Sequence, residues 1–172
     1  MFYRVVNGET ELVQLCCDYW MRMHDQDPSD PLVAAYLGAT VAFSASVERS
    51  LPRKGQLAKQ GLELLENAVS VAPENVEVRF LRGTTSQRLP AFMGRRAVAK
   101  QDLAYAASAA PAAVASGELG LDSATASLFH YGMLCAAEGN RHEAQEAWRA
   151  ASNLGPDTPA GRMAEQKFLQ ER

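Results

Sequence analysis

A pattern of small, large and small residues followed by proline recurs four times along the chain and constrains its fold strongly. Packing residues lie twelve, eight and five positions before each proline. The four sets are Cys16, Trp20, Met23 and Pro28; Gly61, Leu65, Ala68 and Pro73; Ala99, Leu103, Ala106 and Pro111; and Ala144, Trp148, Ala151 and Pro156. Spacings of four and three residues place each set on one helix face. Because proline lacks a backbone N–H and clashes with the preceding turn, we expect each helix to end before its proline.

Glycines recur in register with these prolines. Gly38 and Gly83 each lie ten residues after a proline, and Gly132 occupies the corresponding place in the last unit after a delay of eleven residues. A glycine inside a helix costs roughly 1 kcal/mol relative to alanine. Its repeated use therefore indicates positions where two helices approach closely.

The composition favours an all-α fold in one domain. The chain has 172 residues, 47% of them apolar, and it contains no isoleucine. Alanine, which has the highest helix propensity, is abundant, and runs of strand-forming residues are scarce. The length suffices to bury a core without disulfides or metals. Helices are expected at 9–25, 31–48, 56–72, 75–88, 95–109, 122–138, 141–154 and 158–171.

These units resemble the tetratricopeptide repeat (TPR) family, whose repeat is a pair of antiparallel helices. The third unit carries the most complete match, at Leu128, Tyr131, Gly132, Cys135, Gly139, Asn140, Ala144, Trp148, Ala151 and Pro156. The resemblance implies a right-handed α-solenoid of about three helix pairs with flanking N- and C-terminal helices. The expected segments are an N-terminal helix in 9–30, repeats in 31–74, 75–111 and 122–156, and a capping helix in 158–171. The chain departs from the family by extra residues around 50–55, around 89–94 and in 112–122.

The sequence contains no recognisable catalytic, cofactor-binding or metal-binding pattern, so an enzyme is not expected. The three histidines and three cysteines do not have metal-ligand spacing. An odd cysteine count argues against a disulfide framework and favours a reducing, cytoplasmic setting, although a chain that starts after a removed signal or anchor stays open. The uncharged stretch 31–47 is rich in alanine and is expected to be a buried core helix, with no transmembrane segment.

A partner-binding groove is the first candidate site. In the TPR family the first helix of each pair lines a concave groove, and the corresponding lining here is apolar. The groove residues are Phe43, Phe80, Thr84, Gln87, Arg88, Phe129 and Met133. Such a groove suits an amphipathic helix or an apolar peptide. Two alternatives stay open: the groove accepts a partner, or it is filled by the chain's own terminal helix or by a second copy. The basic residues that bind acidic chaperone tails in this family are absent, so a chaperone-tail adaptor is not expected.

A basic edge is the second candidate. Residues 48–100 carry a net charge of +5, whereas the whole chain carries −3. The edge residues are Arg49, Arg53, Lys54, Arg95 and Arg96. Arginine clusters suit carboxylate or phosphate recognition, so an acidic partner is one interpretation. The alternative is a solvated face whose bases pair with nearby glutamates. Nucleic acid is not expected, because the chain is acidic overall.

The sequence therefore predicts a non-catalytic scaffold or adaptor that binds a protein or peptide partner. A TPR protein that self-assembles into a homo-oligomer is the alternative. A small helical enzyme or cofactor carrier is a third, less supported class.

Overall fold

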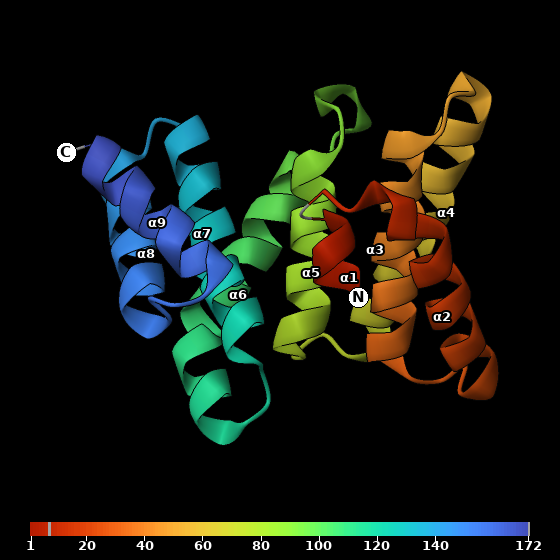
Figure 1. The fold of residues 1–172 in the computed structure, drawn as a ribbon, viewed down its shortest axis with the longest axis horizontal. Coiled ribbons are helices and arrows are strands. Elements are labelled where there is room, and N and C mark those ends of the chain that lie inside the picture. The colour runs from red at the N-terminus through yellow and green to blue at the C-terminus, as the bar shows by residue number, and fades with distance from the viewer. Residues whose placement is uncertain (7, 172) are drawn as a thin grey trace. The chain divides into compact units, whose positions relative to one another are not determined.

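The computed structural model describes residues 1–6 and 8–171, and within them all regular structure is helical, with no strand. The all-α prediction is therefore confirmed. The elements are α1 (Phe2–Val6), η1 (Thr10–Leu12), α2 (Val13–Gln26), α3 (Pro31–Val47), α4 (Leu51–Val71), α5 (Val76–Arg88), η2 (Ala91–Met93), α6 (Arg96–Ser116), α7 (Leu121–Ala137), α8 (Arg141–Leu154) and α9 (Pro159–Gln170). Figure 1 shows their course along the chain.

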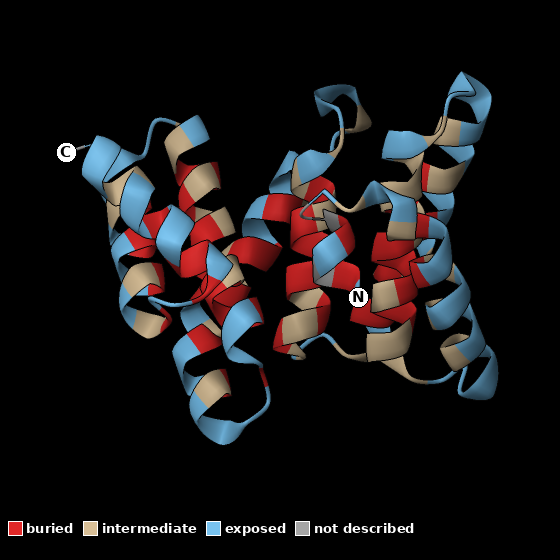
Figure 2. Ribbon diagram, viewed as in Figure 1, coloured by how far each residue is buried: buried red, intermediate tan, exposed pale blue. Residues whose placement is uncertain are grey.

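The chain divides into two compact units, Met1–Thr85 and Ser86–Arg172, and the boundary falls inside α5. We call them unit 1 and unit 2 and describe each by itself. In both units the buried residues lie mainly where helices face one another (Figure 2).

In unit 1, α3 packs against both α4 and α2. The α3–α4 contact is close because two glycines meet there. A Cβ atom on Gly38 would lie 2.8 Å from the carbonyl oxygen of Gly61, and a Cβ atom on Gly61 would lie 2.5 Å from the backbone nitrogen of Ala42. Neither position has room for a side chain, which confirms the predicted close approach at Gly38.

In unit 2, α7 packs against α6, α8 and α9. Gly132 on α7 faces the indole of Trp148 on α8, where a Cβ atom would lie 2.6 Å from Nε1. Trp148 itself is fully buried. The prediction of close approach at Gly132 is thus also confirmed, but here the glycine makes space for a large side chain.

Several helix starts follow from capping residues visible in the sequence. Asp30 accepts hydrogen bonds from the backbone N–H groups of Leu32 (2.8 Å) and Val33 (3.2 Å), and Pro31 occupies the first helical turn of α3. Asn75 accepts from Val78 N–H at 3.0 Å. Thr158 accepts from Gly161 N–H at the start of α9, also at 3.0 Å.

The prediction that Pro111 ends a helix was wrong. Helix α6 was expected to end at 109, but it continues through Pro111 to Ser116. Ala110 and Ala113 on either side of the proline are buried, so packing and alanine propensity outweigh the lost hydrogen bond. The helix ends at Gly117, which adopts a left-handed conformation (φ 79°) that favours glycine.

Two expectations in the first third of the chain also need correction. The residues around 50–55 were treated as an insertion before a helix at 56, yet α4 begins at Leu51 with Pro52 in its first turn. The first helix was expected at 9–25, but α2 begins at Val13, and the short helix α1 lies before it.

The apolar stretch 31–47 forms α3 and has the buried character expected for it. Ala34, Ala35, Leu37 and Ala39 are all buried. Among the residues described, none of the helices has both the length and the hydropathy needed to span a bilayer.

Candidate partner-binding surfaces

The predicted groove residues differ in their exposure. Phe80, Thr84 and Phe129 are buried, and the Thr84 hydroxyl donates to the carbonyl oxygen of Phe80 at 2.9 Å. Phe43, Gln87 and Met133 are half-buried, and Arg88 is exposed. Phe43, Phe80 and Thr84 belong to unit 1, whereas Gln87, Arg88, Phe129 and Met133 belong to unit 2. A shared groove across these residues therefore stays a prediction, and the two buried phenylalanines are unsuitable as probes of binding alone.

Within unit 1, one apolar stripe of α3 is well defined. Leu32, Tyr36, Ala39 and Phe43 follow each other at spacings of four, three and four residues and so share a helix face. Ala39 is part of the buried cluster of unit 1, and the other three side chains pack against that cluster while staying partly exposed. This α3 stripe lies on a different side of the helix from Gly38, which faces α4.

The chain's own helix α1 covers part of the α3 stripe. Phe2 and Val5 are buried in the same cluster, with relative exposures of 7% and 0%, and α1 contacts both α2 and α3. Figure 1 shows α1 beside α3, near the label N. In unit 1 the stripe is therefore partly filled from within, by a segment that the sequence did not predict to be helical.

Tyr36 is the centre of this contact. Its ring stacks on Trp20 of α2 with a centroid distance of 4.4 Å and an interplanar angle of 4°. The ring of Phe2 meets it edge-on at 5.3 Å. The Tyr36 hydroxyl donates to Glu77 Oε1 on α5. Tyr36 therefore joins α1, α2, α3 and α5 through one side chain.

An ion pair between Arg4 and Glu9 joins α1 to the segment that follows it. Arg4 on α1 donates through Nε to Glu9 Oε1 at 2.8 Å, and its guanidinium forms a second bond to Glu9 Oε2. The Arg4 guanidinium lowers the pKa of the Glu9 carboxyl. Both side chains are exposed, so this pair fixes geometry more than it adds stability.

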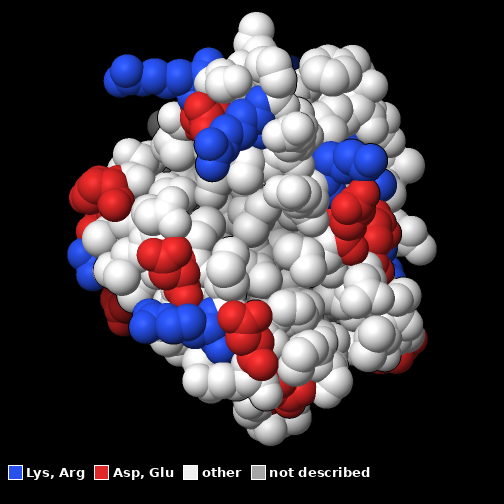
Figure 3. All heavy atoms as spheres, turned by 90° about the vertical axis from the view of Figure 1, so that its right-hand side faces the viewer, with Lys and Arg blue, Asp and Glu red and all other residues white. Residues whose placement is uncertain are grey.

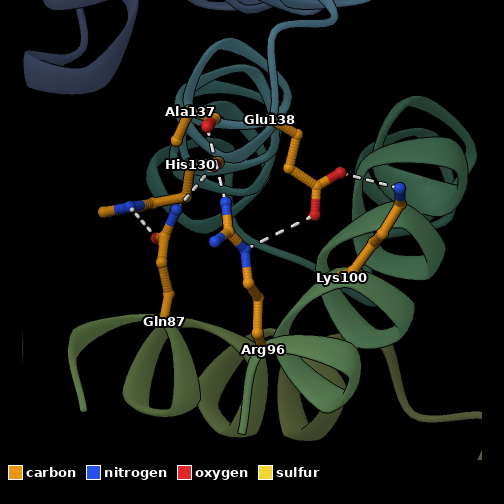
Figure 4. Close-up of polar contacts among 6 residues, drawn as sticks. All are labelled: Gln87, Arg96, Lys100, His130, Ala137 and Glu138. Carbon is orange, nitrogen blue, oxygen red and sulfur yellow. Dashed lines mark hydrogen bonds and ion pairs between the residues drawn. The ribbon is translucent and has the colours of Figure 1, made fainter. Parts of the chain in front are cut away.

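Unit 2 contains a polar contact between the end of α5 and the middle of α7 (Figure 4). His130 Nδ1 lies 3.1 Å from Gln87 Oε1, and Gln87 Nε2 donates to the His130 carbonyl oxygen at 3.2 Å. Desolvation of the imidazole, with a smaller effect from the Arg88 charge, lowers the pKa of His130 to about 4. The ring is therefore neutral at physiological pH, and its Nδ1–H donates to the Gln87 amide oxygen.

The basic residues at the start of α6 are paired within unit 2. Lys100 donates to Glu138 Oε2 at 2.7 Å, Arg96 Nε lies 3.7 Å from Glu138 Oε1, and Arg96 also donates to the Ala137 carbonyl oxygen at 3.4 Å (Figure 4). The hydrogen bond to Glu138 raises the pKa of Lys100. These contacts join α6 to the C-terminal end of α7, where a positive charge is favourable.

Three basic-edge residues of unit 1, Arg49, Arg53 and Lys54, lie near the acidic side chain of Glu48. The Glu48 carboxylate accepts from the backbone N–H groups of Ser50 (2.9 Å) and Arg49 (2.6 Å), and Arg53 Nε lies 3.3 Å from it. Bonds from Ser50 and Arg49 lower the pKa of Glu48, with smaller contributions from the charges of Arg53 and Lys54. Seen from the side of α2 and α4, basic and acidic side chains lie beside each other around an uncharged middle (Figure 3). Arg53 and Arg96 thus each lie near a glutamate, Glu48 and Glu138, and whether the basic edge binds an acidic partner stays a prediction.

The cysteines, whose thiols are potential nucleophiles, pack within their own units. Cys16 and Cys135 are buried, and Cys17 Sγ lies 3.3 Å from Ser44 Oγ, where burial raises the pKa of its thiol. A raised pKa disfavours the nucleophilic thiolate. Within residues 1–6 and 8–171, no group of histidine, cysteine and acidic side chains is arranged to hold a metal ion.

Comparison of the chain with protein-family models, with curated proteins and with solved structures finds no match.

Proposed function

We propose that this chain is a non-catalytic scaffold or adaptor with TPR-like architecture, a right-handed solenoid of about three helix pairs that binds a peptide or helix of a partner protein. Each proposed helix pair occupies one segment, 31–74, 75–111 or 122–156, and the flanking helices lie in 9–30 and 158–171. The basic edge is a secondary contact for an acidic segment.

One observation carries this proposal: α3 needs apolar neighbours on more than one side. Gly38 packs it against α4, and the α3 stripe of Leu32, Tyr36, Ala39 and Phe43 lies on another side. A helix that is apolar all round must be surrounded, as in the interior of a helical stack. The stripe is nevertheless left partly exposed, which is the property that a binding face requires.

The close packing at Gly38 and at Gly132 supports the same architecture. Both glycines lie in the first helix of a proposed pair and face its second helix, α4 or α8. Stacked helix pairs of this type offer extended surfaces for binding proteins.

Partner capture with matched variants tests the proposal. The full chain is immobilised and exposed to its native cell extract, beside variants Phe43→Ser and Leu51→Ser. Phe43 belongs to the α3 stripe, whereas Leu51 begins α4 in the same unit and is 80% exposed. A stoichiometric partner held by the chain and by Leu51→Ser, but lost with Phe43→Ser, is expected.

Light scattering of the purified chain at micromolar concentration distinguishes the alternative. A monomer agrees with an adaptor. A dimer or larger species, with no foreign protein captured, would replace the adaptor by a self-assembling protein.

A further inference from the structure

Helix α1 is too short to cover the α3 stripe. Five helical residues extend about 7.5 Å, whereas the stripe from Leu32 to Phe43 extends about 18 Å at 1.5 Å per residue. Leu32, Tyr36 and Phe43 accordingly stay only partly buried. An occupant of about three helical turns would match the length of the stripe.

With α1 in place, the indole N–H of Trp20 has no hydrogen-bond acceptor within the described residues. Trp20 Nε1 is buried beside Tyr36. An unsatisfied buried donor costs about 1–3 kcal/mol. A segment that supplied an oxygen to this N–H would recover this free energy, which α1 does not.

The side chains of α1 show which chemistry the face accepts. Phe2 places an aromatic ring against Tyr36, and Val5, three residues later, places a β-branched side chain in the core on the same helix face. Between them, Arg4 reaches Glu9. The pattern is aromatic, any residue, basic, β-branched.

We propose that α1 occupies a site on the α3 stripe of unit 1 that a partner helix binds. The partner is an amphipathic helix of about three turns that carries the same aromatic–x–basic–β-branched pattern. The inference rests on the proposed function and specifies its partner class. The partner displaces α1, places its longer apolar face along Leu32, Tyr36 and Phe43, and replaces Arg4 at Glu9.

Displacement is feasible because α1 has little stability of its own. Isolated helices shorter than about 12 residues are marginal in water. The tether nevertheless gives α1 a high effective concentration, of millimolar order for a short linker, so a free segment binds more weakly than it would to the uncovered face. Removing the apolar contacts of α1 is therefore expected to strengthen binding of a free segment.

A labelled synthetic peptide with the sequence of residues 1–12 is the probe, and fluorescence anisotropy gives its dissociation constant. It is measured on the full chain, on a Phe2→Ser/Val5→Ser variant, and on a Leu15→Ser/Leu51→Ser control that alters exposed leucines of unit 1. We expect at least about tenfold tighter binding to the Phe2→Ser/Val5→Ser variant than to the unaltered chain or the control. A peptide with serine at its own positions 2 and 5 should not bind.

A folded Phe2→Ser/Val5→Ser variant that does not bind the peptide would overturn the inference, since α1 would then be an ordinary part of the core. Circular dichroism and the cooperativity of melting establish whether this variant is folded. The adaptor function would survive that result if the capture experiment still gave a stoichiometric partner, so the two failures are distinguishable.

Hydrogen exchange on the unaltered chain keeps the inference testable if the variant does not fold. Excess peptide should accelerate exchange of the amides in 2–6 while leaving α3 and α4 protected. Unchanged exchange at the highest soluble peptide concentration would count against displacement. A peptide-sensitive dimer of the chain would show instead that the α1 of a second copy is the occupant, and would replace the partner class proposed here.

Discussion

The helix pairs α3–α4 and α7–α8 achieve close contact with different atoms. In α3–α4 two glycines face each other, so the limiting contacts are between backbone atoms of Gly38, Gly61 and Ala42. In α7–α8 the glycine faces a side chain, because Gly132 lies against the Trp148 indole. A glycine inside a helix can therefore indicate contact between two backbones or space for one large residue. The first kind of contact cannot adjust, whereas the second can adjust by rotation or replacement of the side chain.

The two units also differ in what they bury. The cluster of unit 1 is apolar and aromatic around Tyr36, and the same unit also buries Thr40, Arg82 and Thr84. Unit 2 buries Ser123, Thr125, Ser127 and Thr158, and it holds His130 in its neutral form. Burial of an ionisable group makes stability depend on pH. Protonation of His130 should therefore destabilise unit 2 as the pH falls.

The largest effect is expected from Gly61→Ala. The added Cβ atom would meet the Gly38 carbonyl oxygen and lie 2.5 Å from Ala42 N, and backbone atoms of two packed helices must then separate. We expect a loss of about 3 kcal/mol in the free energy of unfolding, measured by urea denaturation.

Gly55→Ala on the same helix is the matched control. A Cβ atom at Gly55 would meet no atom within 4 Å, so this change should stabilise α4 by up to about 1 kcal/mol through helix propensity. Equal effects of Gly55→Ala and Gly61→Ala would show that the α3–α4 contact is not limited by backbone atoms.

A somewhat smaller effect is expected from protonation of His130. Its folded pKa of about 4 lies below the unfolded value of 6.5, so the unfolded state binds more protons between these pH values. Stability should consequently fall as pH decreases from 6.5 towards 4. Each pKa unit corresponds to 1.36 kcal/mol, so the loss of stability reaches about 2 kcal/mol at pH 5, about 1.5 units below the unfolded pKa.

His130→Gln should reduce the loss of unfolding free energy between pH 6.5 and 4, because glutamine does not titrate. Stability near pH 8 should be less affected. Urea denaturation across the pH range gives both curves. If the free energy of unfolding of His130→Gln falls with the same slope below pH 6.5, another group is responsible for the pH dependence.

The smallest effect is expected from Gly132→Ala. Its Cβ atom would lie 2.6–2.7 Å from indole atoms of Trp148, a side chain that can shift slightly. We expect a loss of about 1 kcal/mol by thermal or urea denaturation.

Combining Gly132→Ala with Trp148→Phe sharpens the comparison between the two helix pairs. The smaller ring should relieve the clash, so the double variant should be more stable than the sum of the two single effects predicts. Additive effects would mean that the indole does not limit the α7–α8 contact.

Sequence reasoning found what local patterns encode. The periodic packing residues predicted Leu65, Leu103 and Trp148 on inward faces, and all three are fully buried. The glycine register predicted the close contacts at Gly38 and Gly132. These features follow from spacing along one helix, so they can be read without knowing what lies opposite.

The features it missed depend on tertiary contacts. Helix α1 is too short to show periodicity, and it is held by Tyr36, Trp20 and the core beneath them. Pro111 lies in a helix whose flanking alanines are buried, which outweighs its local preference. Phe80 and Phe129 were assigned to a groove that was left open to a partner or filled from within, and both are buried, because position in a repeat does not determine how far a side chain is covered.

The hydroxyl of Thr158 has a consequence for the order in which unit 2 folds. It lies 3.0 Å from Thr125 Oγ1 on α7 and 2.7 Å from the Gly155 carbonyl oxygen, and it caps the first turn of α9. The bonds to Gly155 and Gly161 are local, whereas the contact with Thr125 forms only when α7 is in place, so docking against α7 adds to the stability of the first turn of α9. Because an isolated helix of this length is marginal in water, amide protection in α9 during refolding should appear after protection in α7.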